Sequence, residues 1–150
     1  MHILFTGDSE GERQLFHSTL TRYADNSYDV ALAEGGEEMF YMLDSSATLP
    51  DLIFLAYELP LKDGLDCLKE LRNNSKTRGI PVVMYCDMDP HWLVNASYIH
   101  GADFYLKKPD DIDDVLVIVD WLKVHLPAQG LKPGRDSFVL KATELPRAHQ

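Results

Sequence analysis

Short apolar runs alternate along this chain with longer segments in which apolar residues recur at helical spacing. Five of the runs have the length and composition of buried strands, at residues 3–6, 28–33, 52–56, 81–86 and 104–106. Strands that are separated by helices form parallel β-α-β units. The pattern therefore predicts an α/β domain with five strands and five helices, and no internal repeat is visible.

The segments of helical period carry start and stop signals. Ser9, followed three residues later by Glu12, is typical of a capping box at the start of the first helix. Asp89 and Pro90 predict the N-cap and first residue of the fourth helix, and Gly101 predicts its end. The remaining helices are expected at residues 37–43, at residues 65–72 and after Pro109, where four aspartates favour the positive end of a helix dipole.

Composition is that of a soluble globular domain, with 150 residues of which 45% are hydrophobic and 25% charged. A formal charge of −10 disfavours phosphate backbones and anionic lipids, so we expect no nucleic-acid partner and no membrane partner. The apolar stretches are too short to cross a bilayer. The two cysteines, Cys67 and Cys86, form no disulfide framework, and no signal peptide opens the chain, so a reducing cytoplasm is expected. Cys67 lies on the apolar stripe of the third helix and is expected in the core.

Residues 51–64, DLIFLAYELPLKDG, have the pattern of a buried strand that brings its last residue to an edge of the sheet. In open α/β sheets, ligands bind beyond the carboxyl ends of the strands. The last strand residue here is Ala56, which can neither coordinate a metal nor attack a substrate. The segment therefore has the layout of a functional site without a reactive group at its centre.

The order of these segments resembles the receiver domain of bacterial two-component response regulators. The similar stretches are ILFTGDSEGERQLF, PDLIFLAYELPLKDGLDCLKELR, IPVVMYCD and GADFYLKKP, which lie in the same order as in that family. The resemblance implies a flavodoxin-like, doubly wound parallel sheet with strand order 2-1-3-4-5. It covers residues 1–126 and leaves residues 127–150 as a C-terminal extension; because no output domain follows, the chain resembles a stand-alone receiver.

The resemblance also implies a chemistry, phosphoryl transfer from a histidine kinase to an aspartate at the end of the third strand. In that family two acids after the first strand and the phosphoacceptor hold Mg²⁺, while a hydroxyl and a lysine contact the phosphoryl group. The corresponding positions here are Gly7 and Asp8, Ala56, Cys86 and Lys108. Because an alanine offers no oxygen for an aspartyl phosphate, we expect a pseudo-receiver that is not an enzyme, has lost its Mg²⁺ site and uses no other cofactor. It would act through phosphorylation-independent contacts with a histidine kinase or a downstream signalling protein.

Alternatives remain open at these positions. Asp8 is expected to neutralise Lys108, but the two could instead bind phosphate or a small anion, or a non-standard residue could be phosphorylated. Cys86 is either a small replacement for the hydroxyl residue or a redox-sensitive thiol beside a lysine. Tyr105 matches the family's switch aromatic, and without phosphate and hydroxyl it is expected to be a fixed surface residue.

The last helix has apolar residues on two sides. One set is expected to pack on the sheet: Ile112, Val115, Leu116, Val119 and Leu122. A second set, which we call the outer stripe, consists of Val117, Trp121 and Val124. Since receivers commonly use the face of their fourth helix, fifth strand and fifth helix for dimerisation and signalling, a second subunit is one candidate cover. The other is the extension, which carries Phe138 and Leu140, although an exposed extension is equally compatible with the sequence.

Overall fold

The structure is a computed structural model that describes residues 1–23, 27–126 and 134–145. Its six strands form one parallel sheet in the order β2-β1-β3-β4-β5-β6. The strands are β1 (His2–Thr6), β2 (Asp29–Ala33), β3 (Leu52–Ala56), β4 (Val82–Cys86), β5 (Phe104–Lys107) and β6 (Val139–Leu140). The predicted fold class and the order of the first five strands are confirmed, whereas the predicted strand count was one too low.

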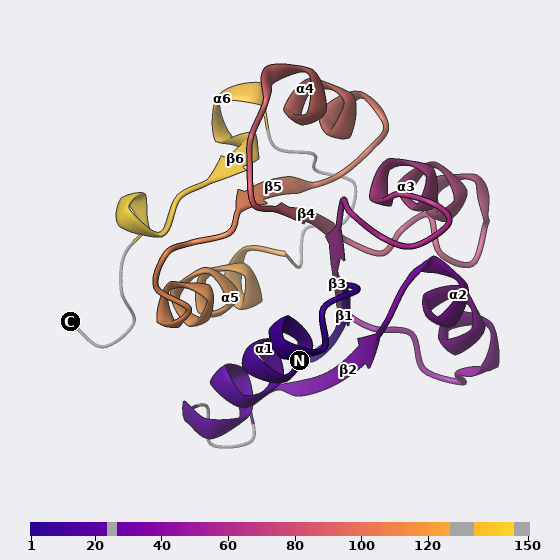
Figure 1. The fold of residues 1–150 in the computed structure, drawn as a ribbon, viewed down its shortest axis with the longest axis horizontal. Helices are drawn as coiled ribbons and strands as arrows, with labels where there is room; N and C mark the ends of the chain where they lie inside the picture. The colour runs from indigo at the N-terminus through magenta and orange to yellow at the C-terminus, as the bar shows by residue number, and fades with distance from the viewer. Residues whose placement is uncertain (24–26, 127–133, 146–150) are drawn as a thin grey trace.

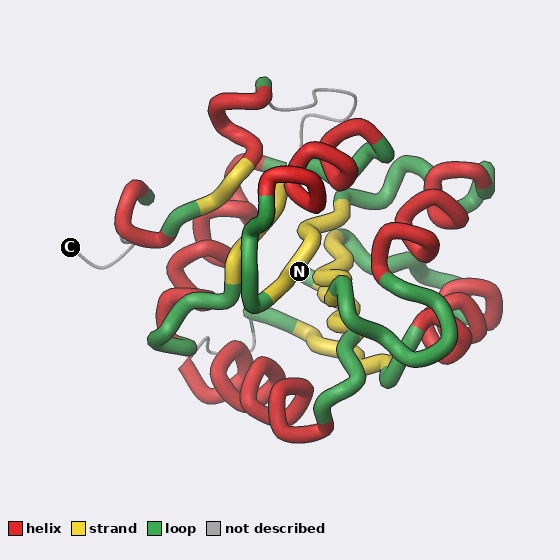
Figure 2. The backbone as a smooth tube through the Cα atoms, turned by 45° about the horizontal axis from the view of Figure 1, so that its top comes forward, coloured by secondary structure: helices red, strands yellow, loops and turns green. Residues whose placement is uncertain are grey.

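Helices cover both faces of the sheet (Figures 1 and 2). One face carries α1 (Glu10–Tyr23) and α5 (Asp113–His125), and the other carries α2 (Gly36–Ser45), α3 (Gly64–Asn73) and α4 (His91–Ile99). Two short elements follow in the extension, α6 (Arg135–Phe138) and the 3₁₀ turn η1 (Ala142–Glu144). The five long helices therefore match the predicted number, and the extension adds structure that the sequence pattern did not indicate.

Two of the predicted helix starts differ from the structure in detail. Ser9 Oγ accepts a hydrogen bond from the Glu12 N–H at 3.2 Å, as a capping box requires, but the Glu12 carboxylate binds a lysine. Pro90, and not Asp89, is the N-cap of α4, because the Pro90 carbonyl accepts from the Leu93 N–H at 3.0 Å. Gly101 follows α4 with φ at +98°, as its predicted role requires.

The core consists of two apolar layers, one on each face of the sheet. All residues of β3 and β4 are buried, so these central strands pack against helices on both sides. On the α1 and α5 face, Phe16 packs against Phe5 and Phe54 with ring centroids 4.4 and 5.0 Å apart. On the opposite face Cys67 is fully buried, as predicted, and burial raises the pKa of its thiol to about 11.

The extension adds the sixth strand at the edge of the sheet. Val139 and Leu140 pair in parallel with Tyr105 and Leu106 of β5, and Phe138 and Leu140 are 2% and 4% exposed. The Pro- and Gly-containing stretch before this segment lies outside the described residues from position 127 to position 133. A strand of two residues is too short to show period-2 alternation, which is why sequence patterning did not predict it.

The outer stripe of α5 is not one continuous surface. The Trp121 ring packs edge-on against Phe104 at 5.8 Å and stacks on His125 at 4.1 Å. Val117 is half-buried, whereas Val124 is 69% exposed. Among the described residues, Trp121 shares an apolar layer with Leu140 and Ala142 of the extension, whereas Val124 is not part of that layer. Cover of the whole stripe by the extension or by a second subunit stays a prediction.

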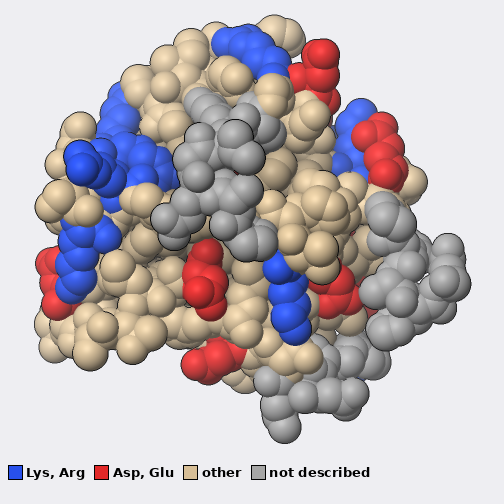
Figure 3. All heavy atoms as spheres, turned by 180° about the vertical axis from the view of Figure 1, so that it is seen from behind, with Lys and Arg blue, Asp and Glu red and all other residues tan. Residues whose placement is uncertain are grey.

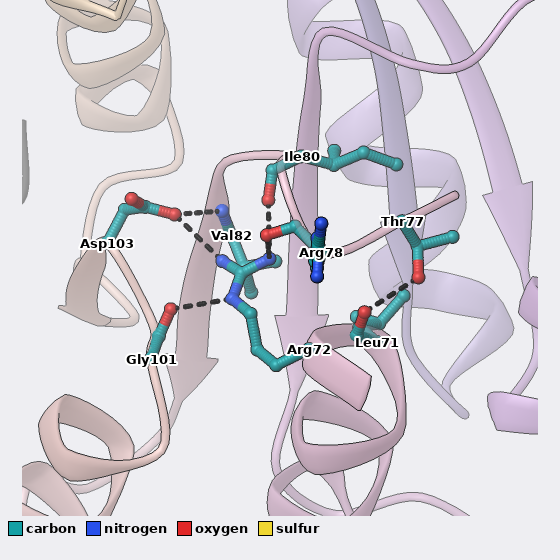
Figure 4. A network of polar contacts seen from close by, with 8 residues as sticks. All are labelled: Leu71, Arg72, Thr77, Arg78, Ile80, Val82, Gly101 and Asp103. Atoms are coloured by element: carbon teal, nitrogen blue, oxygen red, sulfur yellow. Dashed lines mark hydrogen bonds and ion pairs between the residues drawn. The ribbon is translucent and has the colours of Figure 1, made fainter. Parts of the chain in front are cut away.

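Arg72 of α3 ties together the amino-terminal ends of the central strands (Figure 4). Its guanidinium donates hydrogen bonds to the carbonyl oxygens of Gly101 and Ile80 at 2.9 and 2.8 Å and forms an ion pair with Asp103 at 3.0 Å. Asp103 in turn accepts a hydrogen bond from the Val82 N–H at 2.8 Å. Since charge-assisted bonds are stronger than neutral ones, this network holds together the amino-terminal ends of β4 and β5. These ends lie opposite the predicted site, which is at the carboxyl ends of the strands.

The surface carries charges of both signs. On the face seen from behind, Lys and Arg side chains gather along one border, and Asp and Glu side chains are scattered among uncharged residues (Figure 3). The acidic excess of the chain is therefore not collected on that face. In the described part of the chain, every helix is too short or too polar to cross a membrane.

Candidate functional site

The carboxyl ends of β1, β3 and β4, together with the residues after β5, enclose a pocket of about 230 Å³. It is lined by four acidic side chains, a lysine, a serine, a tyrosine and the last residues of β3 and β4, namely Asp8, Ser9, Glu12, Ala56, Glu58, Tyr85, Cys86, Asp87 and Lys108. Of the site residues predicted from sequence, the pocket brings together Asp8, Ala56, Cys86 and Lys108. Parallel strands point their carboxyl ends to one edge, which is why residues far apart in the chain meet there.

The loop after β3 is fixed by close packing. The Gly64 N–H donates to the Tyr57 carbonyl at 2.7 Å, which closes the loop back onto the end of the strand. A Cβ atom at residue 64 would lie 2.2 Å from the Ala56 carbonyl oxygen, so only glycine fits. Asp63 then caps α3 by accepting from the Asp66 N–H at 2.9 Å. This geometry explains why the loop is kept although its strand ends in an alanine.

Gly7 lies at the end of β1 beside Ala56. A Cβ atom at residue 7 would be 3.9 Å from the Ala56 Cβ, so side chains at these two positions would share one space. The same Cβ would lie 2.9 Å from the Phe5 ring, which no real side chain tolerates without movement. Phe5 is fully buried and packs against Phe16 and Tyr85. An aromatic ring therefore occupies part of the volume that an acidic side chain at position 7 would need.

Lys108 is bound by carboxylates of this chain. Its Nζ lies 2.5 Å from Glu12 Oε1 and 3.6 Å from Asp87 Oδ1, and it sits 5.4 Å from the centre of the Tyr85 ring. Burial lowers the pKa of Lys108, but the hydrogen bond and charge of Glu12, with the charge of Asp87, raise it overall. The expectation that Asp8 neutralises Lys108 was wrong, because Glu12 extends from the first turn of α1 and reaches the ammonium group at ion-pair distance.

Tyr105 and Cys86 lie side by side on neighbouring strands. Tyr105 is fully buried, and its hydroxyl donates to the Met88 carbonyl oxygen. Burial is the largest cause that raises the pKa of Tyr105, followed by the neighbouring Cys86. The expectation of a surface aromatic was therefore wrong, since the ring lies inside, under the loop after β4. Cys86 is also buried, at 3% exposure.

Of the three positions that hold a divalent cation in the resembling family, only Asp8 is acidic in this chain. Among the residues that the structure describes, His, Cys, Asp and Glu side chains form no group of three or more that could hold a metal ion. Asp8 alone remains of the three carboxylate positions, and the Glu12 carboxylate is engaged by Lys108. Hard cations such as Mg²⁺ need several oxygen ligands around one point.

Sequence reasoning missed several residues of this pocket. Glu12 was interpreted as part of a helix cap, and Glu58, Tyr85 and Asp87 received no role. Each of the last three lies within two residues of the end of a central strand, so its position in the chain could have indicated the pocket. Nothing in the sequence pattern indicated that Glu12 would turn from its helix end to the lysine.

The comparisons with known proteins agree with this architecture. The family model described as the response regulator receiver domain matches residues 3–120. Since this match spans most of the chain, the protein belongs to the response regulator receiver family.

The chain is similar in sequence to a chemotaxis protein and to response regulators from bacteria. The chain is 31% identical over 109 residues to the chemotaxis protein CheY1 of Helicobacter pylori, covering 73% of this chain and 86% of that protein. It is 29% identical over 136 residues to the response regulator Rcp1 of Synechocystis, covering 84% and 92%. A solved Mn²⁺-bound form of response regulator Rcp1 superimposes with a TM-score of 0.70 at 25% identity over 89% of this chain and 99% of that one. The phosphorylated cyanobacterial phytochrome response regulator RcpA, at 22% identity, shares the fold with a TM-score of 0.75 over 87% and 98%.

Proposed function

We propose that this protein is a pseudo-receiver, which transmits a signal through contacts with other proteins and without becoming phosphorylated. The observation that carries the proposal is the ion pair between Lys108 and Glu12, at 2.5 Å. Both residues line the same pocket as Ala56, the last residue of β3. The lysine that would meet a phosphoryl group already has a carboxylate partner. A methyl group at position 56 cannot form the covalent intermediate.

Two further features support the proposal. The Phe5 ring fills space that an acidic side chain at position 7 would use, and the buried thiol of Cys86 stands where the family has a hydroxyl. The pocket thus keeps the family's shape while three of its polar groups are absent. The expected partners are a histidine kinase or a downstream signalling protein, and no nucleic acid is expected because of the acidic charge.

Incubation with acetyl phosphate, followed by intact mass spectrometry, tests the proposal. The wild-type chain is expected to gain no phosphoryl group at any residue. The positive control is a restored variant with Gly7→Asp and Ala56→Asp, combined with Phe5→Leu to make room for the new carboxylate. Label on the wild-type chain would overturn the proposal, and peptide mapping would then identify the non-standard residue.

The alternative of an anion site at Asp8 and Lys108 is tested separately with inorganic phosphate. An anion that binds the native state raises its melting temperature in a saturable way. We expect no shift for the wild-type chain, because Glu12 holds the lysine. A saturable shift that Lys108→Met abolishes would support the anion site instead.

A further inference from the structure

Residues 134–145, which we call the tail segment, bind along the free edge of β5. Figure 1 shows β6 beside β5, with α4 and α5 to either side. The tail segment pairs with β5 through two register pairs, Tyr105 with Val139 and Leu106 with Leu140. Without it, β5 would be an edge strand with unpaired backbone groups, and such edges bind further strands readily.

The tail segment places an apolar anchor on each face of the sheet. On the α4 face, the Phe138 ring is 2% exposed and packs edge-on against Tyr98, with centroids 5.1 Å apart. On the α5 face, Leu140 and Ala142 are 4% and 8% exposed and join the apolar layer that includes Trp121. Phe138 on one face and Leu140 with Ala142 on the other therefore hold the tail segment against the edge strand β5.

A cation adds a third contact. The Arg135 guanidinium lies over the Tyr98 ring, 4.9 Å from its centre. Cation–π contacts at exposed sites are weak, so this one adds selectivity more than strength. Together these contacts define a sequence pattern. It consists of an arginine (Arg135), an aromatic residue three positions later (Phe138), an aliphatic residue two positions after that (Leu140) and a small residue a further two positions on (Ala142).

This chemistry is that of peptide recognition by strand addition. In that mode main-chain hydrogen bonds give affinity, and pockets for individual side chains give specificity. The tail segment contacts β5, α4 and α5, so its detachment would leave the central strands packed. Any extended segment with the same pattern would satisfy the same edge.

We propose that the β5 edge is a binding site for an extended segment of a partner protein and that the tail segment is its internal occupant. The partner segment carries the pattern of arginine, aromatic and aliphatic residues seen in residues 135–142, and it binds when the tail segment leaves. This site goes beyond the phosphorylation-independent function proposed above, since it shares no residue with the pocket that holds Ala56 and Lys108 and does not require that either position be inert.

The test uses the full-length chain and a fluorescein-labelled peptide of residues 134–145. A variant with Phe138→Asp and Leu140→Asp removes the internal occupant and leaves the edge itself unchanged. In fluorescence anisotropy this variant is expected to bind the peptide, and the wild-type chain is expected to bind it at least about tenfold more weakly. The factor follows because an edge that is open about one tenth of the time keeps only about one tenth of its intrinsic affinity. A peptide with Phe138→Asp is the matched negative control.

Two results would overturn the inference. One is no peptide binding by a variant whose circular dichroism matches the wild type. The other is equal binding by both chains, which would place the peptide elsewhere. Hydrogen exchange of the wild-type chain covers the case in which the variant does not fold. The amides of β6 are then expected to exchange at least about tenfold faster than those of β4, because local detachment costs less than global unfolding, and equal exchange rates would refute an edge that opens. The phosphorylation assay is independent of each of these outcomes.

Discussion

Replacing Glu12 by glutamine should destabilise the protein mainly through the lost contact with Lys108 and less through the helix end. A charge-assisted hydrogen bond contributes about 1.5–3 kcal/mol. The Lys108 and Glu12 side chains are 17% and 35% exposed, and Asp87 at 3.6 Å remains as a second partner. Solvent screening and this second carboxylate reduce the expected loss to about 1–2 kcal/mol. For a chain of this size that corresponds to a fall of about 2–8 °C in melting temperature.

Glu10→Gln is the matched control, because Glu10 lies in the same first turn of α1 and is exposed. Both substitutions remove one negative charge near the helix N-terminus, where such a charge stabilises a helix by about 0.3–1 kcal/mol. The difference between them therefore reports the contact with Lys108. A double-mutant cycle with Lys108→Met should give a coupling energy of about 1–2 kcal/mol by thermal or urea unfolding. If Glu12→Gln and Glu10→Gln lower stability equally and the coupling is near zero, the ion pair has no energetic role and the argument built on it fails.

Three other perturbations have defined outcomes. Mg²⁺ should leave the melting temperature and the tryptophan fluorescence unchanged, because an ion that binds the native state must stabilise it; a saturable rise would show a site built from other oxygens. Arg72→Met should lower the free energy of unfolding by about 2 kcal/mol, since the partly buried Asp103 and the Gly101 and Ile80 carbonyls lose their donor. Arg78→Met, at an exposed position, should change it by less than about 0.5 kcal/mol in a urea titration. Burial raises the pKa of Cys67 from 9.0 to about 11, so its contribution to stability is present below pH 9 and is lost as pH rises toward 11; a Cys67→Ala variant should lack this part of the pH dependence.

The sequence predicted the sheet well because central strands are the most strongly patterned segments. β3 and β4 are apolar at every position, and such runs are recognisable without knowledge of their partners. The sixth strand failed this test, since Phe138 and Leu140 gain their burial from contacts with α4, β5 and α5 that are distant in the chain. Local pattern cannot reveal a strand that is defined by its neighbours.

The pocket was predictable in position and not in its bonds. The carboxyl ends of parallel strands all lie on one side of the sheet. Asp8, Ala56 and Lys108 could therefore be placed together from the order of the strands alone. The choice of Glu12 over Asp8 as the lysine partner depends on side-chain reach from α1, which sequence does not encode directly. The same limit explains Tyr105, whose burial depends on the loop after β4 that accepts its hydroxyl.

The Phe5 ring beside Gly7 has a consequence for substitutions in this pocket. Regaining an aspartate at position 7 by a single substitution would force the new Cβ against a ring that is packed between Phe16 and Tyr85. That substitution alone would lower stability, whatever residue stands at position 56. The packing of Phe5 and the side chains at positions 7 and 56 are therefore coupled, so under the proposed function phosphotransfer would require coordinated substitutions at all three positions.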